Sequence, residues 1–494
     1  MKTDHIELPV AGPQSEKKLR KIIDLPGPKG LPILGNALQI KRHLLHQKFE
    51  EWSKEFGSYY RVQIGGRKLL IIGDHQTFAK ILRDRPDGFN RTIRLAETWR
   101  DMGLQVGLFG ANGEVWKRQR RMVMAGFDPA HVKEYFPALC KVVGRLESRW
   151  AKSLGESIDL QADLMRFTVD AITGLAFGHD VNTLESGDDV IQRHLDKIFP
   201  AVFRRNLAVF KYWEFIRLPS DRALDRSVIA VNAAIERFIV SARTRIQQQP
   251  ALRDKPSNLL EAMINAADQG DSGLTDADVA GNVLTMLLAG EDTTANSIAW
   301  VLALLWNNQA VLKKLRDEVR SHFDQQADQA APAPYSIEKL NELDYLDACI
   351  NESMRLKPVA PVLPLQAARD TVIDDIEIPA NTIIFGLFRR DSMDDKHLPN
   401  AAQFDPERWL MQNAQPGDSG INSVKRISMP FGAGPRICPG RYLALLEMKI
   451  ALAMLFSRFD IVDISTPDGK EAQEFLAFTM APLGLSMCLK RRAA

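Results

Sequence analysis

The pattern of apolar and polar positions divides the chain into a long helical stretch and several short β-like runs. Residues 59–73 contain two β-rich runs on either side of a Gly-Gly pair, which predicts a hairpin. From about residue 74 to 325 the apolar residues recur with the period of a helix. Breaks in this helical pattern fall near residues 85–113, 177–187, 199–221 and 268–275. Short β-like runs return at 358–390 and in the C-terminal tail, and a helix that is apolar on nearly every face is predicted at about 439–458.

The arrangement of these elements predicts one large domain that is mainly α with a small β portion. No internal repeat is visible, and no Pro-, Gly- or Ser-rich linker divides the chain into two foldable halves. Residues 1–24 carry scattered charges without apolar periodicity, so we expect a flexible N-terminal tail there and the folded domain over residues 25–494.

Composition and charge exclude several classes of protein. Of the 494 residues, 45% are hydrophobic and 26% charged, as in an ordinary globular domain with a large core. The net charge of +2 argues against a general nucleic-acid binder. The four cysteines form no CxxC pair, which argues against a disulfide framework. The longest clean apolar stretch, SIAWVLALLW, falls far short of the ~20 residues that span a bilayer, so we expect a cytoplasmic protein without a membrane span.

The sharpest chemical signal is the loop FGAGPRICPG at residues 431–440, which leads into the apolar helix. Pro439 suits a first helical turn, so Cys438 is expected at a buried helix N-terminus, where free N–H groups favour a thiolate. Arg436 supplies a cation for an anionic group beside it. The alternative is an inert buried cysteine after a turn, and the glycine density, the arginine and the helix start all count against it.

This loop resembles the pattern FxxGxRxCxG of the cytochromes P450, the haem-thiolate monooxygenases, and the resemblance extends over about residues 25–490. It implies that haem b is the cofactor, with Cys438 as the axial thiolate and Arg436 paired with a haem propionate. Phe431 and Gly440 are the outer positions of the same haem-binding loop. A thiolate ligand pushes electron density onto the iron and favours cleavage of the O–O bond.

A second signal is a long apolar helix with acids in its middle. Thr275 and Asp278 form a capping-box pattern, and the helix is predicted over residues 275–306. Its centre reads AGEDTT, where a buried acid needs a partner or a function and a mid-helix threonine bends the backbone. The alternative is a polar stripe that faces solvent. AGEDTT resembles the P450 pattern [A/G]Gx[D/E]T[T/S], which implies that Asp292 and Thr293 are the acid–alcohol pair of oxygen activation.

Two weaker motifs agree with the resemblance. Glu352 and Arg355 match ExxR, which alone indicates only a helical ion pair, and FDPERW at 404–409 is similar to the PERF segment of the family. The resemblance implies a buried structural triad of Glu352, Arg355 and Arg408 that holds the Cys loop. Many relatives carry a His-Arg-Asp-Pro-like segment before PERF, and here the stretch 389–392 reads Arg-Arg-Asp-Ser without the histidine.

Further cofactor contacts are expected on the helix that contains Trp116 and Arg120. These residues match the family's WxxxR and lie four apart, on one helix face, so both can reach one haem propionate. Arg91 is a further candidate for a propionate contact. A basic surface helix with a packed tryptophan is the alternative interpretation.

The resemblance also names candidates for the substrate pocket, which together imply an apolar substrate. The candidates are Leu95, Trp99, Phe109, Phe203, Leu288, Ala289, Val362 and Met480. Each one, taken alone, is more often a core residue than a ligand contact.

The leading hypothesis is a stand-alone haem domain that inserts one atom of O2 into an apolar organic substrate, a fatty acid, steroid or terpenoid. No GxGxxG follows a strand, so we expect electrons from a separate protein of the ferredoxin or flavodoxin/reductase type. Several basic residues flank the elements expected beside the haem. They form either a docking face for the acidic electron donor or an ordinary solvated surface. They are Lys117, Arg118, Arg121, Lys133, Lys425, Arg426 and Arg441. Two alternatives stay open: a peroxide-using haem-thiolate enzyme, against which the acid–threonine pair argues, and a haem sensor or electron carrier, which needs no substrate cavity.

Overall fold

The computed structural model describes residues 19–127, 129–186, 190–323, 335–410 and 424–492. The helices are α1 Leu45–Phe56, α2 His75–Arg83, α3 Ile93–Asp101, α4 Gly113–Gly126, α5 Pro129–Lys152, α6 Leu160–Phe177, α7 Thr183–Ser186, α8 Val190–Leu207, α9 Pro219–Gln248, α10 Leu259–Ala267, α11 Asp276–Trp306, α12 Gln309–Phe323, α13 Ile337–Asn341, α14 Asp344–Leu356, α15 Val424–Ile427 and α16 Arg441–Arg458. The strands are β1 Arg20–Lys21, β2 Tyr59–Ile64, β3 Arg67–Ile72, β4 Phe89–Asn90, β5 Ser157–Asp159, β6 Val362–Ala367, β7 Thr371–Ile373, β8 Ile376–Ile378, β9 Ile383–Leu387, β10 Phe459–Ser465, β11 Glu474–Leu476, β12 Met480–Pro482 and β13 Ser486–Arg491.

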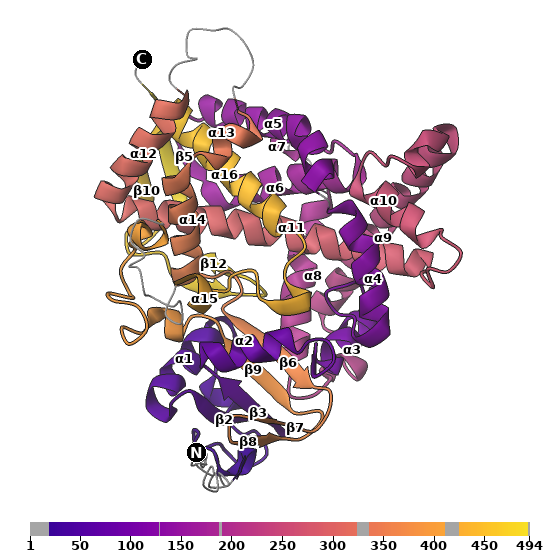
Figure 1. Ribbon diagram of the computed structural model, residues 1–494, viewed down its shortest axis with the longest axis vertical. Helices are drawn as coiled ribbons and strands as arrows, with labels where there is room; N and C mark the ends of the chain where they lie inside the picture. Colours follow the sequence, from indigo (N-terminus) through magenta and orange to yellow (C-terminus); the bar gives the residue numbers. More distant parts are fainter. Residues whose placement is uncertain (1–18, 128, 187–189, 324–334, 411–423, 493–494) are drawn as a thin grey trace, which may run out of the picture.

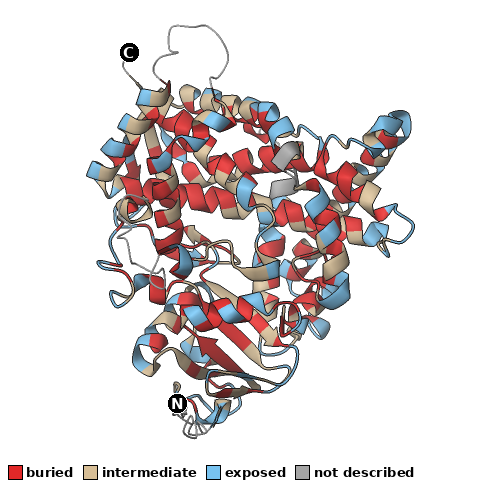
Figure 2. Cartoon of the chain, viewed as in Figure 1, coloured by how far each residue is buried: buried red, intermediate tan, exposed pale blue. Residues whose placement is uncertain are grey.

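Helix α11 crosses the middle of the helical part and organises the core (Figure 1). The hydroxyl of Thr275 accepts the N–H of Asp278, and the carboxylate of Asp278 accepts the N–H of Thr275, so the predicted capping box is present. Helix α11 packs along α6 and also contacts α14 and α16. Buried residues follow all four helices in Figure 2, which accounts for their apolar sequences. Among the described residues, no helix combines the length and apolarity needed to cross a bilayer.

The largest sheet lies at the other end of the molecule, with α1 and α2 against it, whereas β5 and β10 lie beside α12 at the helical end (Figure 1). The largest sheet has the strand order β2-β3-β9-β6-β4. The predicted hairpin 59–73 is present as β2 and β3, and β3 pairs in parallel with β9, Leu69 opposite Ile383. Two small sheets, β10-β13-β5 and β11-β12, are built mainly from the C-terminal segment. The mainly α fold with a small β portion is therefore confirmed.

Several element boundaries differ from the sequence-based expectation. The predicted break at 85–113 contains the amphipathic helix α3, and α8 continues through Pro200 as far as Leu207. Helix α16 begins at Arg441, so Pro439 lies before the helix and not in its first turn. Strand β1 pairs with β8, and the Arg20 guanidinium binds Asp375, so the first described residues are joined to the β7–β8 segment.

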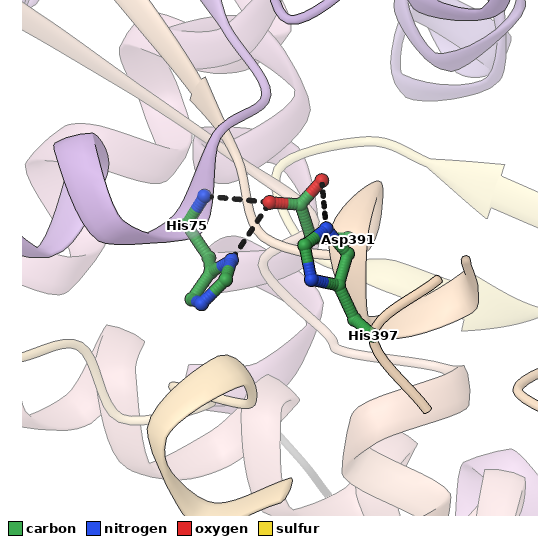
Figure 3. A group of neighbouring side chains, drawn as sticks. All are labelled: His75, Asp391 and His397. Carbon is green, nitrogen blue, oxygen red and sulfur yellow. Dashed lines mark hydrogen bonds and ion pairs between the residues drawn. The ribbon is translucent and has the colours of Figure 1, made fainter. Parts of the chain in front are cut away.

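A cluster of polar side chains fastens the start of α2 to the segment after β9 (Figure 3). The Asp391 carboxylate accepts the backbone N–H of His75 at 2.8 Å and its Nδ1 at 2.8 Å, and His397 Nε2 lies 3.7 Å from the other oxygen. The Arg390 guanidinium contacts the same carboxylate. Although burial opposes ionisation, these donors hold the pKa of Asp391 below its ordinary value. The stretch 389–392 lacks the histidine that many relatives carry. His75 and His397, which lie outside this stretch, contact its aspartate, Asp391.

Candidate functional site

The Cys loop is held between α2 and α16 by close backbone packing. Gly434 has φ +70°, and a Cβ there would lie 2.3 Å from the carbonyl oxygen of Leu82 at the end of α2, so only glycine fits. The backbone N–H of Cys438 donates to the carbonyl of Phe431 at 3.0 Å. Gly440 is the N-cap residue of α16. The loop therefore places the sulfur just before a helix N-terminus, as the sequence predicts.

The electrostatics of the Cys438 thiol are a balance of opposing effects. The side chain is accessible, yet protein encloses it on most sides, and this enclosure raises the pKa of the Cys438 thiol. The backbone N–H of Gly440 and the charges of Arg120 and Arg441 act in the opposite direction. The net shift of the Cys438 pKa is upward, because burial outweighs the effect of the helix N-terminus on which the sequence-based expectation rests. Coordination of a metal ion deprotonates a thiol outright and supplies the missing stabilisation.

Four arginine side chains gather beside the loop from separate elements. Arg436 donates to the carbonyls of Leu108 and Ala111 and to Asn112 Oδ1, at 3.1, 2.8 and 3.1 Å. Its guanidinium also lies 5.0 Å from the Trp116 ring, so Trp116 orients Arg436. The other three members of this arginine cluster are Arg85, Arg91 and Arg120.

No carboxylate in the described ranges pairs with any of the four. Burial and mutual repulsion lower the pKa of Arg85 to about 7 and that of Arg436 to about 8, and burial lowers the pKa of Arg91 to about 10. The Nε atoms of Arg85 and Arg91 are buried without a hydrogen-bond partner. Because unpaired buried cations are costly, the cluster fits a group with two negative charges, such as the two propionates of haem. Arg85 was missed from the sequence, since no local pattern marks it.

The centre of α11 carries the acid and the hydroxyl that the sequence singled out. Thr293 Oγ1 donates to the carbonyl of Ala289 at 2.7 Å, in a helix that stays continuous. Asp292 turns toward a different segment: it accepts Asn296 Nδ2 at 2.7 Å and the hydroxyl of Thr479. Burial raises the pKa of Asp292, and these two donors partly offset the rise. Asp292 and Thr293 are thus neighbours on the helix with separate partners, and Thr479 is a contact that the sequence did not predict.

A second buried acid, Glu447 of α16, lies close to the same turn of α11. It is 2% exposed, and its carboxyl group interacts with the hydroxyl of Thr294, the residue after Thr293. Burial raises the pKa of Glu447 to about 8, with the Thr294 hydroxyl acting against the rise. Glu447 therefore keeps its proton to a higher pH than an ordinary glutamate and is a second candidate proton donor. One acid in an apolar helix has no motif of its own, so the sequence does not mark Glu447 as a candidate.

The raised pKa of Glu447 makes the stability of the protein pH-dependent. An ordinary glutamate in the unfolded chain ionises near pH 4.5, so between about 4.5 and 8 the folded state binds the extra proton. Stability should therefore fall as the pH rises through this window, by up to about 1.4 kcal/mol per pH unit relative to Glu447→Gln, and level off above it. Denaturant unfolding of both proteins from pH 5 to 9 measures the difference. Parallel curves would mean that Glu447 is ionised throughout.

The ExxR pair and the PERW segment meet in a buried ion network. Arg355 Nε and Nη2 both donate to the Glu352 carboxylate at 2.7 Å, and Arg408 Nε reaches it at 2.9 Å. The indole of Trp409 adds a fourth side-chain bond at 2.8 Å. The side chains of Glu352 and Arg355 are 0% exposed. Arg355 also donates to three backbone carbonyls between residues 392 and 403, so the network fixes that whole segment.

The structure separates the proposed pocket residues into two groups. Leu95, Trp99, Leu288 and Met480 are at most 5% exposed and belong to the hydrophobic core. Phe109, Phe203 and Val362 are half-buried, and Ala289 is exposed. The Phe478 ring stacks on Phe199 at 4.6 Å and lies 5.7 Å from Phe109. An aromatic wall therefore adjoins Thr479 and Asp292, with the first group packed in the core.

The chain is similar to many known proteins over most of its length. The family model "Cytochrome P450" matches residues 25–489. The chain is 25% identical over 496 residues to cytochrome P450 94A1 of Vicia sativa, covering 94% of this chain and 90% of the relative. It is 27% identical over 451 residues to the self-sufficient cytochrome P450 monooxygenase CYP505E5 of Aspergillus niger, covering 89% of this chain and 40% of that protein. The crystal structure of the cytochrome P450DA heme domain has the same fold, with a TM-score of 0.81 at 22% identity over 96% of this chain and 99% of that one.

These matches agree with the geometry of the site. The family uses haem with an axial cysteine thiolate, and the buried arginine cluster beside a cysteine loop fits that cofactor. The family model also covers the hairpin, α11, the ion network and the Cys loop in one alignment. The chain therefore belongs to the cytochrome P450 family of haem-thiolate monooxygenases.

Proposed function

We propose that this enzyme inserts one atom of O2 into a C–H or C=C bond of an apolar substrate of the fatty acid, steroid or terpenoid class. The observation that carries the proposal is the unpaired arginine cluster beside the Cys438 loop, in a fold whose long helix α11 also carries the acid–threonine turn. Bound haem supplies the activation of O2 and the oxidising power. The half-buried residues Phe109, Phe203 and Val362 support an apolar substrate.

Each part of the site has a distinct role in this proposal. The sulfur of Cys438 ligates the iron, and Arg85, Arg91, Arg120 and Arg436 neutralise the propionates. Thr293 Oγ1 holds a proton at the centre of α11, and Asp292, which accepts hydrogen bonds from Asn296 and Thr479, is the neighbouring carboxyl group that can supply protons to this site. Because burial raises the pKa of Asp292, this carboxyl group gives up and regains a proton more readily near neutral pH than an exposed aspartate.

The proton relay is tested by Thr293→Ala. The substitution keeps the helix, since alanine is the best helix former, and removes only the hydroxyl. Haem content and substrate binding should persist, while the fraction of electrons recovered in product falls severalfold and hydrogen peroxide rises. The measurement is product formed and peroxide released per reductant consumed.

A matched control exists on the same helix. Thr285 Oγ1 donates to the carbonyl of Gly281 at 2.8 Å. Thr293 makes the same bond to the carbonyl four residues before it, further along the same helix. Thr285→Ala should leave the coupling unchanged. Full coupling in Thr293→Ala would reject Thr293 as the relay and reopen the assignment in favour of Glu447.

We infer that the electrons come from a separate ferredoxin or flavodoxin/reductase-type protein. Exposed cations at Arg121, Lys425, Arg426 and Arg441, on elements near the Cys loop, support this inference because they can bind an acidic protein surface. Two of the predicted docking cations are already engaged, Lys117 by Glu114 and Lys133 by Glu338. The four cysteines, unpaired with one another, support a reducing compartment such as the cytoplasm. Turnover of the purified protein with a reduced nicotinamide nucleotide and no second protein would contradict a separate electron donor. Turnover with hydrogen peroxide and no reductant would favour the peroxide-using alternative.

A further inference from the structure

Three side chains that can ligate a metal ion meet where the start of α2 packs against the segment after β9 (Figure 3). His75 is the first residue of α2, Asp391 follows β9, and His397 lies further along the same segment. One ring nitrogen of each histidine and one oxygen of the carboxylate all lie within 4.8 Å of one another. The proposed function uses none of the three residues, so their convergence needs a separate explanation.

Hydrogen bonding accounts for only one of the two histidines. Asp391 Oδ2 lies 2.8 Å from His75 Nδ1, which is a normal hydrogen-bond length. His397 Nε2 lies 3.7 Å from the other oxygen, which is too far for a hydrogen bond, and its ring meets the His75 ring edge-on with centroids 5.0 Å apart. A hydrogen bond to Asp391 therefore does not explain why the His397 ring stands here.

The separations between the donor atoms are close to those around a zinc ion. Ligand nitrogens and oxygens lie about 2.0–2.1 Å from tetrahedral Zn2+, and hence about 3.4 Å from one another. The observed 2.8 and 3.7 Å lie on either side of this value, so side-chain shifts of about 1 Å would bring all three ligands onto one ion. The tautomer of His75 that carries its proton on Nε2 directs the Nδ1 lone pair at that ion. His75 Nε2 makes no hydrogen bond to the described residues, so none of them excludes this tautomer.

The types of donor select the class of metal. Two imidazoles and one carboxylate suit Zn2+, and three such ligands leave a fourth position for water. Mg2+ and Ca2+ prefer oxygen ligands and would gain little from two histidines. The cluster therefore fits a divalent transition-metal ion, and Zn2+ is the ion that we test.

The groups around Asp391 hold its carboxylate in place for such an ion. The backbone N–H of His75 donates to Oδ2 at 2.8 Å, and the Arg390 guanidinium contacts Oδ1. Carboxylates that ligate metals usually accept outer hydrogen bonds of this kind, which fix their orientation. The charge of Arg390 also opposes a second cation, so we expect a moderate dissociation constant on the order of 1 µM.

An ion can reach the cluster from the side of His397. The His397 side chain is 25% exposed, whereas His75 and Asp391 are 7% and 1% exposed. A site with one accessible ligand and two buried ones has an entry path and also shields the bound ion from competing water.

Helix α2 connects this cluster to the Cys loop. The helix runs from His75 to Arg83, and the carbonyl of Leu82 near its end packs against Gly434 of the loop. Arg85 of the arginine cluster follows two residues after the helix. An ion that fixes the first residue of α2 to the segment after β9 would therefore restrict movement of the helix that supports the loop.

We propose that His75, Asp391 and His397 form a Zn2+ site that fastens α2 to the segment after β9 and thereby stabilises the Cys loop. The inference does not depend on the substrate class or on the proton relay.

The test measures zinc binding by the haem-loaded protein after a chelator has removed other metal ions. Dialysis against graded concentrations of ZnCl2, followed by elemental analysis for zinc and iron, gives the zinc bound per haem and its dissociation constant. Wild type should bind one zinc ion that His397→Gln binds at least about tenfold more weakly. His397 makes only the 3.7 Å contact to Asp391, so this variant should fold, and Asp391→Asn is a second variant that should lose the same zinc.

A second measurement tests the link to the Cys loop. Bound zinc should slow the transfer of haem from wild type to excess apomyoglobin severalfold, and it should have no effect on the rate in His397→Gln. MgCl2 in place of ZnCl2 should leave the rate unchanged in both proteins.

His43→Gln is the matched control, because His43 is an exposed histidine that stacks on Phe475, outside the cluster. It should bind zinc as wild type does. Failure of wild type to bind zinc at 10 times the expected dissociation constant, about 10 µM, would overturn the inference, and so would equal affinity in wild type and His397→Gln. Zinc binding without any change in the rate of haem loss would reject the proposed stabilisation of the Cys loop.

Discussion

Cys438→Ser should abolish the red-shifted Soret band that reduced haem-thiolate proteins show with CO. A serine hydroxyl ionises far less readily than a thiol and is a hard oxygen ligand, so it cannot supply the soft anionic sulfur. The arginine cluster remains in this variant, so haem can still associate through its propionates. The expected result is thus a changed spectrum with measurable haem, and the test is the CO difference spectrum normalised to haem content.

The other three cysteines provide controls in distinct environments. Cys140 and Cys488 are half-buried, and Cys349 is fully buried with a pKa well above its ordinary value because of burial and nearby acids. Cys140→Ser, Cys488→Ser and Cys349→Ala should all retain the band. A band that persists in Cys438→Ser, or disappears in one of the controls alone, would assign the ligand elsewhere.

The sequence predicts those features that depend on a short run of neighbouring residues. The capping box located the start of α11 to one residue, and the Gly-Gly pair located the hairpin. The Cys loop was recognisable because several residue types with separate physical roles stand close together. Geometry that depends on distant segments was not predictable: the pairing of β3 with β9 joins residues 69 and 383, and Asp292 meets a hydroxyl at residue 479.

Some properties of the site differ from the sequence-based expectation because they depend on residues that are far apart in the sequence. Arg85 is an ordinary arginine in sequence, and only burial beside Arg91 and Arg436 gives it a role. The start of α16 does lower the pKa of the Cys438 thiol, but desolvation by atoms from other elements outweighs this effect, so the net shift is upward and opposite to the sequence-based expectation. The sequence predicts Pro439 in the first turn of α16, whereas Gly440 lies between Pro439 and the first helical residue, Arg441. The balance of charge and burial in the folded site therefore could not be predicted from short sequence patterns.

The ion network of Glu352 shows how a weak sequence signal becomes a strong structural one. An ExxR spacing is common, and on a surface it is worth about 0–1 kcal/mol. Here the Glu352 carboxylate accepts bonds from two arginines, one indole and the backbone N–H of Asp405, with no exposure of its side chain. The dense bonding offsets the cost of desolvation, so removing one partner leaves buried charge without compensation.

Glu352→Ala should therefore destabilise the protein by about 3–5 kcal/mol and yield little haem-loaded enzyme. Arg355→Lys should also be strongly destabilised, because one ammonium cannot replace a guanidinium that binds a carboxylate and three carbonyls at once.

The control is Glu51→Ala, which breaks an exposed pair of the same helical spacing between Lys48 and Glu51. It should change the unfolding free energy by less than about 1 kcal/mol. Denaturant unfolding and the ratio of haem to protein measure both effects. Normal stability and haem content in Glu352→Ala would mean that water or a rearranged segment 392–409 compensates the two arginines, and the network would then have no part in holding the Cys loop.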